Sequence, residues 1–522
     1  MISIKNLIYH IPEGKKRNYL GSLYVNSITD FYNNFEQNFV DLDDLIERNI
    51  DVVIEKDDFI SDLKLFCNDQ INDILTEIGV RNFSGLNDLR NHLLNYYKIE
   101  VSDDSRLVFN ADDSSHCEIP LHPFQERIRR KVINLIFNNQ KRFLIHMPTG
   151  SGKTRTAAEV ILDFVRLSSS KALLSNKIKI LWVAQSSELC LQAAETVKYV
   201  LDKKGTQSIR LGHFYDDFNI DDVIINEAAI IFCSIQKLLI HYQTDEIWTK
   251  IKNETYLVIV DEAHRSVAAK WVNALNFFVE NHSVYLLGLT ATPGISSSAN
   301  ENNYLLSTFY NGNKVSITNS DYVETVSPIK YLVDRGFLSD IDRIDIDSDV
   351  QINNTGYSIT AEEIKFTDVT LKKLTANPSR NLSIINIIKE NYQKGKKILV
   401  FTCGVEHNRV LHSILMDHNI ESAFIDAKSK NRRQLIDQFK NGNLNVLLNF
   451  GVLTTGFDAP KTDVCIIARP ISSIIMYSQM VGRILRGPLN QGNKNNTLYT
   501  IKDNLGHGDY DQLFKSFNEF YI

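Results

Sequence analysis

Continuous apolar runs alternate with segments of helical spacing through most of the chain after about residue 120. The runs have the length and composition of buried strands and cover residues 143–146, 178–184, 229–233, 256–260, 397–402 and 446–450. Between them, apolar residues recur three or four positions apart, as in residues 155–165. This alternation predicts an α/β protein, with parallel sheets covered by helices on both faces and ligand sites at the carboxyl ends of the strands.

The first 115 residues follow a different pattern. Two stretches, 59–78 and 84–94, have helical spacing, and no catalytic motif is present. They predict a small, mostly helical domain. The Ser/Asp-rich stretch 102–115 is typical of a linker, with one short extended piece at 107–109. The domain either docks a protein partner or covers the rest of the molecule, and the sequence leaves both readings open.

Length, cysteines and charge narrow the class of protein. A chain of 522 residues is expected to form two to four domains. Its 6 cysteines are scattered without a Cys-x-x-Cys pair, which argues against a zinc module and a disulfide framework and favours a cytoplasmic protein. We expect no signal peptide and no membrane span. Residues 1–115 carry 11 Lys and Arg against 21 Asp and Glu, so a polyanion should bind the later part.

A phosphate-binding loop is predicted at residues 147–154, Met-Pro-Thr-Gly-Ser-Gly-Lys-Thr, between a strand and a helix. Small residues let several backbone N–H groups face one anion, and the helix adds its positive end. Lys153 would reach the β- and γ-phosphates of ATP, and the Thr154 hydroxyl would bind Mg²⁺. The rest of the predicted cradle is Thr149, Gly150, Ser151 and Gly152. An ordinary glycine turn is the weaker explanation, although Met147 replaces the usual first glycine.

An acidic pair, Asp261 and Glu262, follows the apolar run 256–260 directly. Asp261 is the candidate for holding Mg²⁺, and Glu262 for orienting and deprotonating the attacking water. Upstream, a helix is expected to begin at residues 121–125, with Pro in its first turn. Gln125 lies shortly before the phosphate loop, and its amide suits the edge of an adenine.

These motifs together resemble the DEAH-box superfamily 2 helicases and translocases. Beyond the phosphate loop and the sequence Asp-Glu-Ala-His, the segments that resemble family motifs are 184–189 (Ia), 233–237, 288–294 (III), 397–402 (IV), 451–460 (V) and 479–486 (VI). With residues 327–338, the pattern looks most like the branch of restriction-enzyme Res subunits and RadD-like proteins. The resemblance covers residues 118–505 and leaves out 1–115.

The resemblance implies further site residues. Arg483 and Arg486, expected on one helix face, would reach the γ-phosphate from the second domain. Residues on the second wall of the ATP site would be Gly456 and Asp458. Residues linking hydrolysis to nucleic acid would be His264, Thr290, Thr292 and Gln479. Candidates for phosphate contacts of the nucleic acid are Ser187, Ser234, Thr402 and Thr455, each of which is otherwise a local cap or turn residue.

The resemblance also implies two tandem RecA-like domains (116–325 and 326–522) and the activity. These domains would follow the helical accessory domain (1–115) that the apolar spacing predicts. The expected function is an ATP-dependent helicase or translocase on duplex or branched DNA. Two other hypotheses remain open: an ATPase motor subunit of a restriction or anti-phage complex without unwinding, and an RNA helicase. Intact Lys153, Glu262, Arg483 and Arg486 argue against a third, a nucleotide-gated binding protein. ATP and Mg²⁺ are the expected cofactors, and residues 1–115 a possible site for a protein partner.

Overall fold

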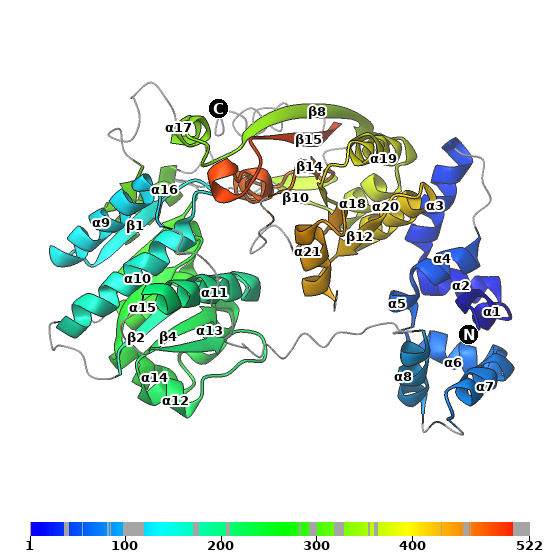
Figure 1. Cartoon of the computed structure of the whole chain (residues 1–522), viewed down its shortest axis with the longest axis horizontal. Helices are drawn as coiled ribbons and strands as arrows, with labels where there is room; N and C mark the ends of the chain where they lie inside the picture. The colour runs from blue at the N-terminus through cyan, green and yellow to red at the C-terminus, as the bar shows by residue number, and fades with distance from the viewer. Residues whose placement is uncertain are drawn as a thin grey trace.

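The computed structural model shows three bodies in a row, which Figure 1 colours blue, cyan to green, and yellow to red. It describes residues 2–504 except 36–40, 55, 81–82, 84, 98–119, 171–176, 205–208, 281–282, 292–299, 318–327, 353–354, 360–363, 428, 430, 453–458 and 460. The linker predicted at 102–115 lies outside these residues. The blue body is the helical N-terminal domain, and the other two are α/β domains.

The first α/β domain is built on a seven-stranded, fully parallel sheet in the order β3-β4-β2-β5-β6-β1-β7. The strands are β1 (Arg142–His146), β2 (Lys179–Ala184), β3 (Arg210–Phe214), β4 (Ala229–Ser234), β5 (Thr255–Val260), β6 (Tyr285–Thr290) and β7 (Lys314–Ser316). The helices are α9 (Pro123–Phe137), α10 (Lys153–Ser170), α11 (Ser187–Lys204), α12 (Asp222–Asn226), α13 (Ile235–His241), α14 (Glu246–Asn253), α15 (Ala269–Val279) and α16 (Asn300–Phe309).

The second α/β domain has a six-stranded parallel sheet in the order β12-β13-β11-β14-β15-β8 and a separate hairpin, β9-β10. The strands are β8 (Asp340–Gln351), β9 (Tyr357–Ile359), β10 (Ile364–Phe366), β11 (Ile398–Phe401), β12 (Ser422–Ile425), β13 (Val446–Asn449), β14 (Val464–Ile467) and β15 (Asn495–Asn504). The helices are α17 (Pro328–Asp334), α18 (Asp368–Ala376), α19 (Pro378–Gln393), α20 (Val405–Asp417), α21 (Arg432–Asn441) and α22 (Ile474–Val481).

The predicted strands coincide with the central strands because continuous apolar runs are buried on both faces of a parallel sheet. Every residue of β2, β4 and β11 is buried. The edge strand β8 alternates Ile with exposed Asp, which the prediction did not include. Charges on an edge strand discourage pairing with another chain. The two parallel sheets confirm the predicted α/β fold with two RecA-like domains.

In its described residues the N-terminal domain has eight helices. They are α1 (Ile4–Ile8), α2 (Glu13–Leu20), α3 (Ser22–Phe35), α4 (Leu42–Arg48), α5 (Ile50–Val53), α6 (Asp57–Phe66), α7 (Asn68–Glu77) and α8 (Leu86–Tyr96). The helical spacing at 59–78 and 84–94 corresponds to α6, α7 and α8, so a mostly helical domain is confirmed. The sequence analysis did not predict helices α1 to α5 individually.

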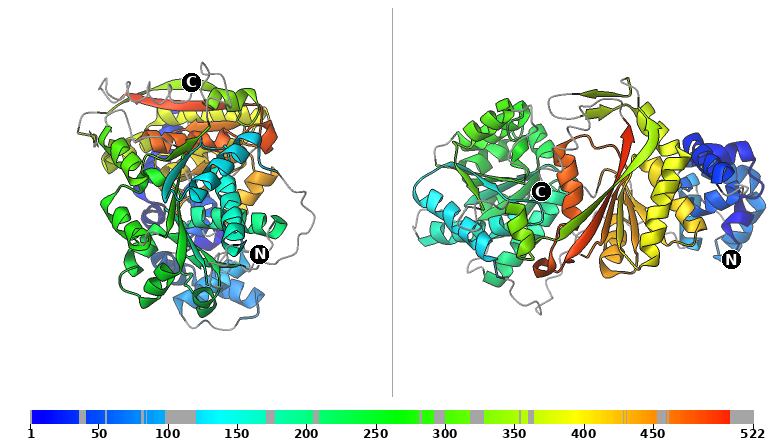
Figure 2. Two further views of the ribbon diagram at one scale, coloured as in Figure 1. Left: turned by 90° about the vertical axis from the view of Figure 1, so that its left-hand side faces the viewer. Right: turned by 90° about the horizontal axis from the view of Figure 1, so that it is seen from above.

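The N-terminal domain shares one hydrophobic core with the second α/β domain. Helix α3 packs against α18, α19 and α20. Its side chains Tyr24, Ile28 and Phe31 belong to the same buried cluster as Ile384 of α19 and Leu411 of α20. The two domains therefore form one packed unit, so residues 4–96 cover the second α/β domain. The views of Figures 1 and 2 agree that this cover lies at the opposite end of that domain from the first α/β domain.

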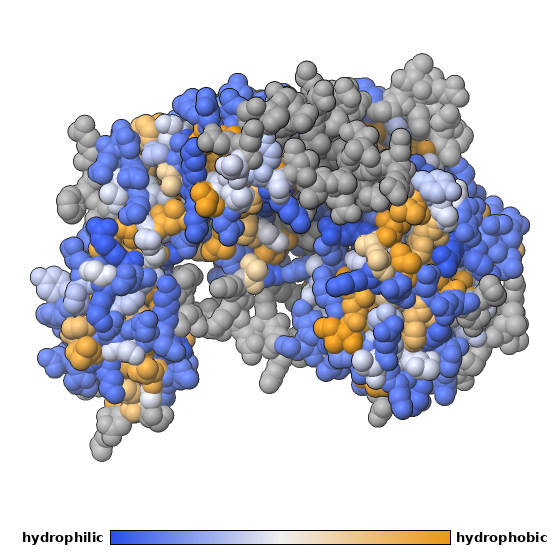
Figure 3. Space-filling model, turned by 180° about the vertical axis from the view of Figure 1, so that it is seen from behind, coloured by the Kyte–Doolittle hydropathy of each residue, from blue (hydrophilic) through white to orange (hydrophobic). Residues whose placement is uncertain are grey.

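The described surface is largely hydrophilic when seen from behind, with apolar residues in small scattered groups (Figure 3). No helix in the described part of the chain is long and apolar enough to cross a membrane. The largest apolar side chains, such as Trp182 and Trp248, are instead buried.

Candidate functional site: an ATP cleft between two α/β domains

The phosphate loop lies between β1 and α10, as predicted. Gly150 and Gly152 have φ angles of +80° and +86°, a region that favours glycine. A Cβ atom on Gly152 would lie 2.3 Å from Nε2 of Gln125, so no side chain fits there without a shift. The Ser151 hydroxyl is buried and donates to the carbonyl of Pro148 at 2.6 Å. The loop is therefore held in its curled form by its own residues.

Gln125 lies beside the phosphate loop and braces it. Its Nε2 donates to the carbonyl of Ser151 at 2.8 Å, and its Oε1 accepts from the backbone N–H of His122 at 2.9 Å. Helix α9 begins at Pro123, as expected for proline in the first turn. Both ends of the amide thus contact the protein in this structure, and the adenine contact stays a prediction.

The acidic pair follows β5, at the carboxyl edge of the sheet. Glu262 has a left-handed φ of +51°, which turns the chain sharply after the strand. Asp261 is buried, and its Oδ1 accepts from the Glu262 N–H at 3.0 Å. Burial raises the pKa of Asp261 to about 7, with the charge of Glu262 adding to the shift and Lys153 opposing it.

Lys153 is the first residue of helix α10, and charged groups of both α/β domains act on it. Burial lowers the pKa of Lys153, Glu262 and Asp261 oppose that shift, and Arg483 of the second domain adds to it. Two carboxylates and two cations thus surround the position where the loop would hold a triphosphate. The hydroxyl and carboxylate oxygens of Thr154 and Asp261 are of the hard type that Mg²⁺ prefers, so these residues fit the ion.

His264 and Thr290 connect the ends of β5 and β6. The His264 Nδ1 lies 3.4 Å from Oε2 of Glu262 and 3.4 Å from the hydroxyl of Thr290. Burial lowers the pKa of His264 to about 4, so the ring is neutral at pH 7. The structure therefore brings together two of the predicted coupling residues beside the predicted base. Thr292 lies outside the described residues.

The second domain meets the phosphate loop through the residues after α22. A Cβ atom on Gly482 would lie 2.1 Å from Cγ2 of Thr149, so the two domains touch here and the contact requires glycine. The Nε of Arg483 donates to the carbonyl of Gln479 at 3.1 Å. Gly456 and Asp458, predicted for the same wall, lie outside the described residues.

The expectation that Arg483 and Arg486 share a helix face is wrong. Helix α22 ends at Val481, and a short 3₁₀ turn, η2 (Gly482–Ile484), follows. Arg486 then forms an antiparallel bridge with Leu338, which holds it in an extended segment. Arg483 is the arginine whose charge acts on Lys153, and Arg486 is not among those charges.

Other contacts between the two α/β domains had no sequence signal. His122 Nε2 lies 2.9 Å from Oδ1 of Asn490, in the turn η3 (Pro488–Asn490), and its ring lies 4.5 Å from that of Phe337. Glu188 of α11 pairs with Arg432 of α21 at 2.5 Å. These partners are hundreds of residues apart in the chain, so only the folded structure reveals them.

The described candidates for nucleic-acid contact already have partners inside the protein. Ser187 donates to Asp216. Ser234 is buried and caps α13 by accepting from the N–H of Lys237 at 3.4 Å. Thr402 is fully buried, and its hydroxyl donates to Asn408 at 2.7 Å. The structure therefore does not support Thr402 as a surface contact. Thr455 lies outside the described residues.

Two family models match the two α/β domains in order. Residues 118–295 match "Type III restriction enzyme, res subunit", and residues 380–488 match "Helicase conserved C-terminal domain". These two segments therefore carry the two domains of a helicase related to restriction-enzyme Res subunits. The predicted resemblance is therefore confirmed, and ATP is the nucleotide that these helicase domains imply.

Curated relatives of this helicase chain include yeast and bacterial proteins. It is 26% identical over 369 residues to IRC3 of Saccharomyces cerevisiae, which is named as an ATP-dependent helicase; the match covers 70% of this chain and 49% of IRC3. It is 25% identical over 388 residues to the type I restriction enzyme EcoAI endonuclease subunit of Escherichia coli, covering 69% and 43%. The chain thus spans about half the length of these curated relatives.

Solved helicase structures share the fold. The helicase MrfA bound to DNA and AMPPNP matches with a TM-score of 0.52 and 13% identity, covering 76% of this chain and 50% of MrfA. A variant of S. cerevisiae Dbp5 bound to RNA matches with a TM-score of 0.50 and 14% identity, covering 77% and 92%. One neighbour holds DNA and the other RNA, so the fold alone does not separate the two nucleic acids.

Proposed function

We propose that this chain is an ATP-dependent translocase or helicase that acts on duplex or branched DNA. The observation that carries the proposal is that the second domain closes on the phosphate loop, where Gly482 lies against Thr149 and the next residue is Arg483. The charges of Glu262 and Asp261 from one domain and of Arg483 from the other act on Lys153. An ATP site completed by a second domain couples hydrolysis to domain movement, because loss of the γ-phosphate removes the shared ligand.

Each residue of the cleft has a role in this proposal. Lys153 and the loop N–H groups bind the β- and γ-phosphates. Thr154 and Asp261 hold Mg²⁺, which neutralises negative charge on the phosphates when bound. Glu262 orients the attacking water and accepts its proton. Arg483 stabilises the charge that develops on the transferred phosphoryl group.

DNA is the preferred substrate because the chain matches the Res model and type I restriction-enzyme subunits. The same relatives favour a second candidate function, in which the chain is the ATPase motor subunit of a larger restriction or anti-phage complex and does not unwind DNA itself. Polar groups at the carboxyl edges of both sheets would contact the phosphate backbone without reading sequence.

The test is the ATPase rate with single-stranded, duplex and forked DNA and with RNA, with strand displacement followed in parallel. We expect the largest stimulation with duplex or forked DNA and nearly none in Lys153→Ala, which lacks the cation facing the phosphates. Stimulation without displacement would favour the motor-subunit function. Stimulation by RNA alone would overturn the assignment to DNA.

A further inference from the structure

Three consecutive residues of α20 connect the N-terminal domain to the end of strand β11. His407, Asn408 and Arg409 are all buried in the first turns of this helix. The first two contact the strand end at Thr402 and Cys403, where the segment that resembles motif IV (397–402) ends. Arg409 contacts the N-terminal domain. This helix turn therefore lies between the strand end and the N-terminal domain and contacts both.

On the strand side, α20 holds both the side chain and the backbone of the strand end. Asn408 accepts from the hydroxyl of Thr402 at 2.7 Å, and Nδ1 of His407 accepts from the N–H of Cys403 at 3.1 Å. Since Nδ1 is an acceptor, Nε2 carries the proton and donates to Oδ1 of Asn381 at 3.0 Å. Burial lowers the pKa of His407 well below its usual value, so this tautomer is neutral.

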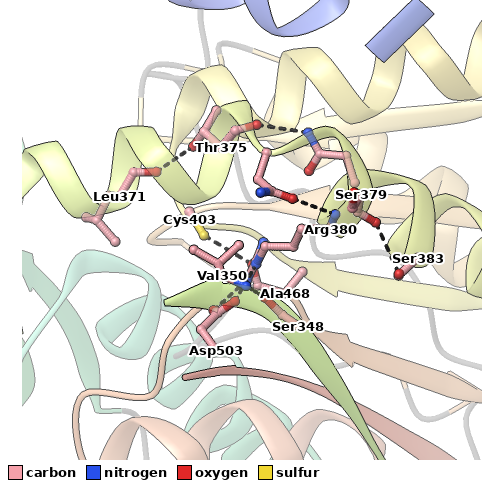
Figure 4. Close-up of polar contacts among 12 residues, drawn as sticks. Ser348, Val350, Leu371, Thr375, Ser379, Arg380, Ser383, Cys403, Ala468 and Asp503 are labelled. Atoms are coloured by element: carbon pink, nitrogen blue, oxygen red, sulfur yellow. Dashed lines mark hydrogen bonds and ion pairs between the residues drawn. The ribbon is translucent and has the colours of Figure 1, made fainter. Parts of the chain in front are cut away.

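Helix α19, which contacts His407 through Asn381, is itself held in place by buried polar contacts. Arg380, next to Asn381, is fully buried and donates to both carboxylate oxygens of Asp503 at 2.8 and 3.0 Å. It also donates to the carbonyl of Ala468 at 3.1 Å, and Cys403 donates to the same carbonyl at 3.2 Å (Figure 4). The beginning of α19 is therefore fixed to the ends of β14 and β15 by a bidentate, dehydrated ion pair.

On the other side, the N-terminal domain binds the buried guanidinium of Arg409. Nε donates to Oδ1 of Asn49 at 3.0 Å, and Nη1 donates to the carbonyl of Leu20 at 2.9 Å. The guanidinium lies over the ring of Tyr24, 4.4 Å from its centroid. Glu406 on α20 itself supplies the countercharge at 3.0 Å. A buried cation needs these hydrogen bonds, so the N-terminal domain fixes the position of this helix turn.

We propose that the N-terminal domain positions the strand end 402–404 so that its backbone at Gly404 can bind nucleic acid, and that Arg409 is the positioning residue. This rests on the proposed function, in which polar groups at the carboxyl edge of the second sheet contact the nucleic-acid backbone. The side chains of Thr402 and Cys403 are buried, whereas, chain neighbours aside, no described residue lies within 4 Å of a Cβ atom built on Gly404. The domain therefore sets the affinity for nucleic acid and leaves ATP chemistry unchanged.

The test compares Arg409→Met with a matched control, Arg48→Met. Arg48 crosses the same interface and pairs with Asp417, but at the far end of α20. We expect Arg409→Met to raise the concentration of a 30-base-pair DNA duplex needed for half-maximal ATPase by about fivefold, with basal turnover unchanged. Arg48→Met should leave that concentration unchanged, although both variants lower the melting temperature. Equal effects of the two variants on the DNA concentration would overturn the proposal.

Amide hydrogen exchange tests the positioning without any nucleic acid. Arg409→Met should speed exchange of the Cys403 amide, which His407 protects, and Arg48→Met should not. Asn49→Ala should reproduce the change, and combining it with Arg409→Met should add little. Unchanged exchange at Cys403 in Arg409→Met would refute the positioning role. Changed exchange in a protein that no nucleic acid stimulates would refute the proposed function alone.

Discussion

The second α/β domain has two interfaces that are built differently. Toward the first α/β domain, loops and helix ends meet. Their contacts are polar at Asn490 with His122 and Arg432 with Glu188, and apolar at Phe337 with Phe124. Toward the N-terminal domain it buries a continuous set of apolar helix faces around α3, α19 and α20.

The difference indicates which parts move together. Opening the N-terminal interface would expose the packed faces of whole helices, α3 against α18, α19 and α20, at about 25 cal/mol per Å² of apolar surface. At the ATP cleft the described contacts join loops and helix ends, and the polar ones among them exchange with water at little net cost. The N-terminal domain and the second α/β domain should therefore move as one body against the first. A partner bound to residues 4–96 would act on the second domain directly.

The largest effect is expected from removing residues 1–115. All predicted hydrolytic motifs lie after residue 115, so motif positions alone would predict that a soluble ATPase remains. The shared core predicts instead that Ile384, Leu411 and their neighbours become exposed and that the truncated chain aggregates. Size-exclusion chromatography and circular dichroism measure this. A monomeric, folded truncation with wild-type basal ATPase would show that the interface is detachable.

The next largest effect is expected on ATP turnover, from a substitution in the ATP cleft. Glu262→Gln should lower the ATP turnover rate by about 10²- to 10⁴-fold, since an amide cannot accept the proton of the attacking water. ATP binding, followed by equilibrium titration with a fluorescent analogue, should be retained. Lys153→Ala serves as the control, because it should lose both ATP turnover and ATP binding. A Glu262→Gln protein with near wild-type turnover would refute the assignment of the base.

The contact between the two domains can be tested by compensation. Gly482→Ala places a methyl group against Cγ2 of Thr149, so the cleft cannot close to its present geometry. We expect ATP turnover to fall by about 10²-fold, as for a misplacement of about 1 Å. Thr149→Ala removes Cγ2 and should restore part of the rate in the double variant. If the second change brings no recovery, the two residues do not meet in the active form.

The smallest effect is a pH dependence of Mg²⁺ affinity. The pKa of Asp261 is raised to about 7, so its carboxyl takes up a proton as the pH falls through 7. Since the ion binds the carboxylate, the Mg²⁺ concentration for half-maximal nucleotide binding should rise about tenfold from pH 8 to pH 6. Glu262→Gln removes the negative charge that helps to raise the pKa of Asp261. In this variant the increase in the required Mg²⁺ concentration should therefore occur at lower pH. A profile that is flat in both proteins would exclude Asp261 as a ligand.

The sequence alone predicted the parts of the molecule that short segments determine. The phosphate loop, the acidic pair and the central strands depend on a few adjacent residues, whose conformational and packing preferences hold in many folds. For this reason the loop before α10 and the carboxylates after β5 lie where they were expected, and the helicase family could be identified from motif order.

The tertiary structure decided what depends on distant partners. The apolar faces of α19 and α20 look alike in the sequence whether they meet their own sheet or another domain, so the attachment of residues 4–96 was hidden. Arg486 lies outside the predicted helix and bridges to the distant Leu338, and the Thr402 hydroxyl points inward to Asn408. Burial and close approach are properties of surfaces that meet only on folding, and no local pattern contains them.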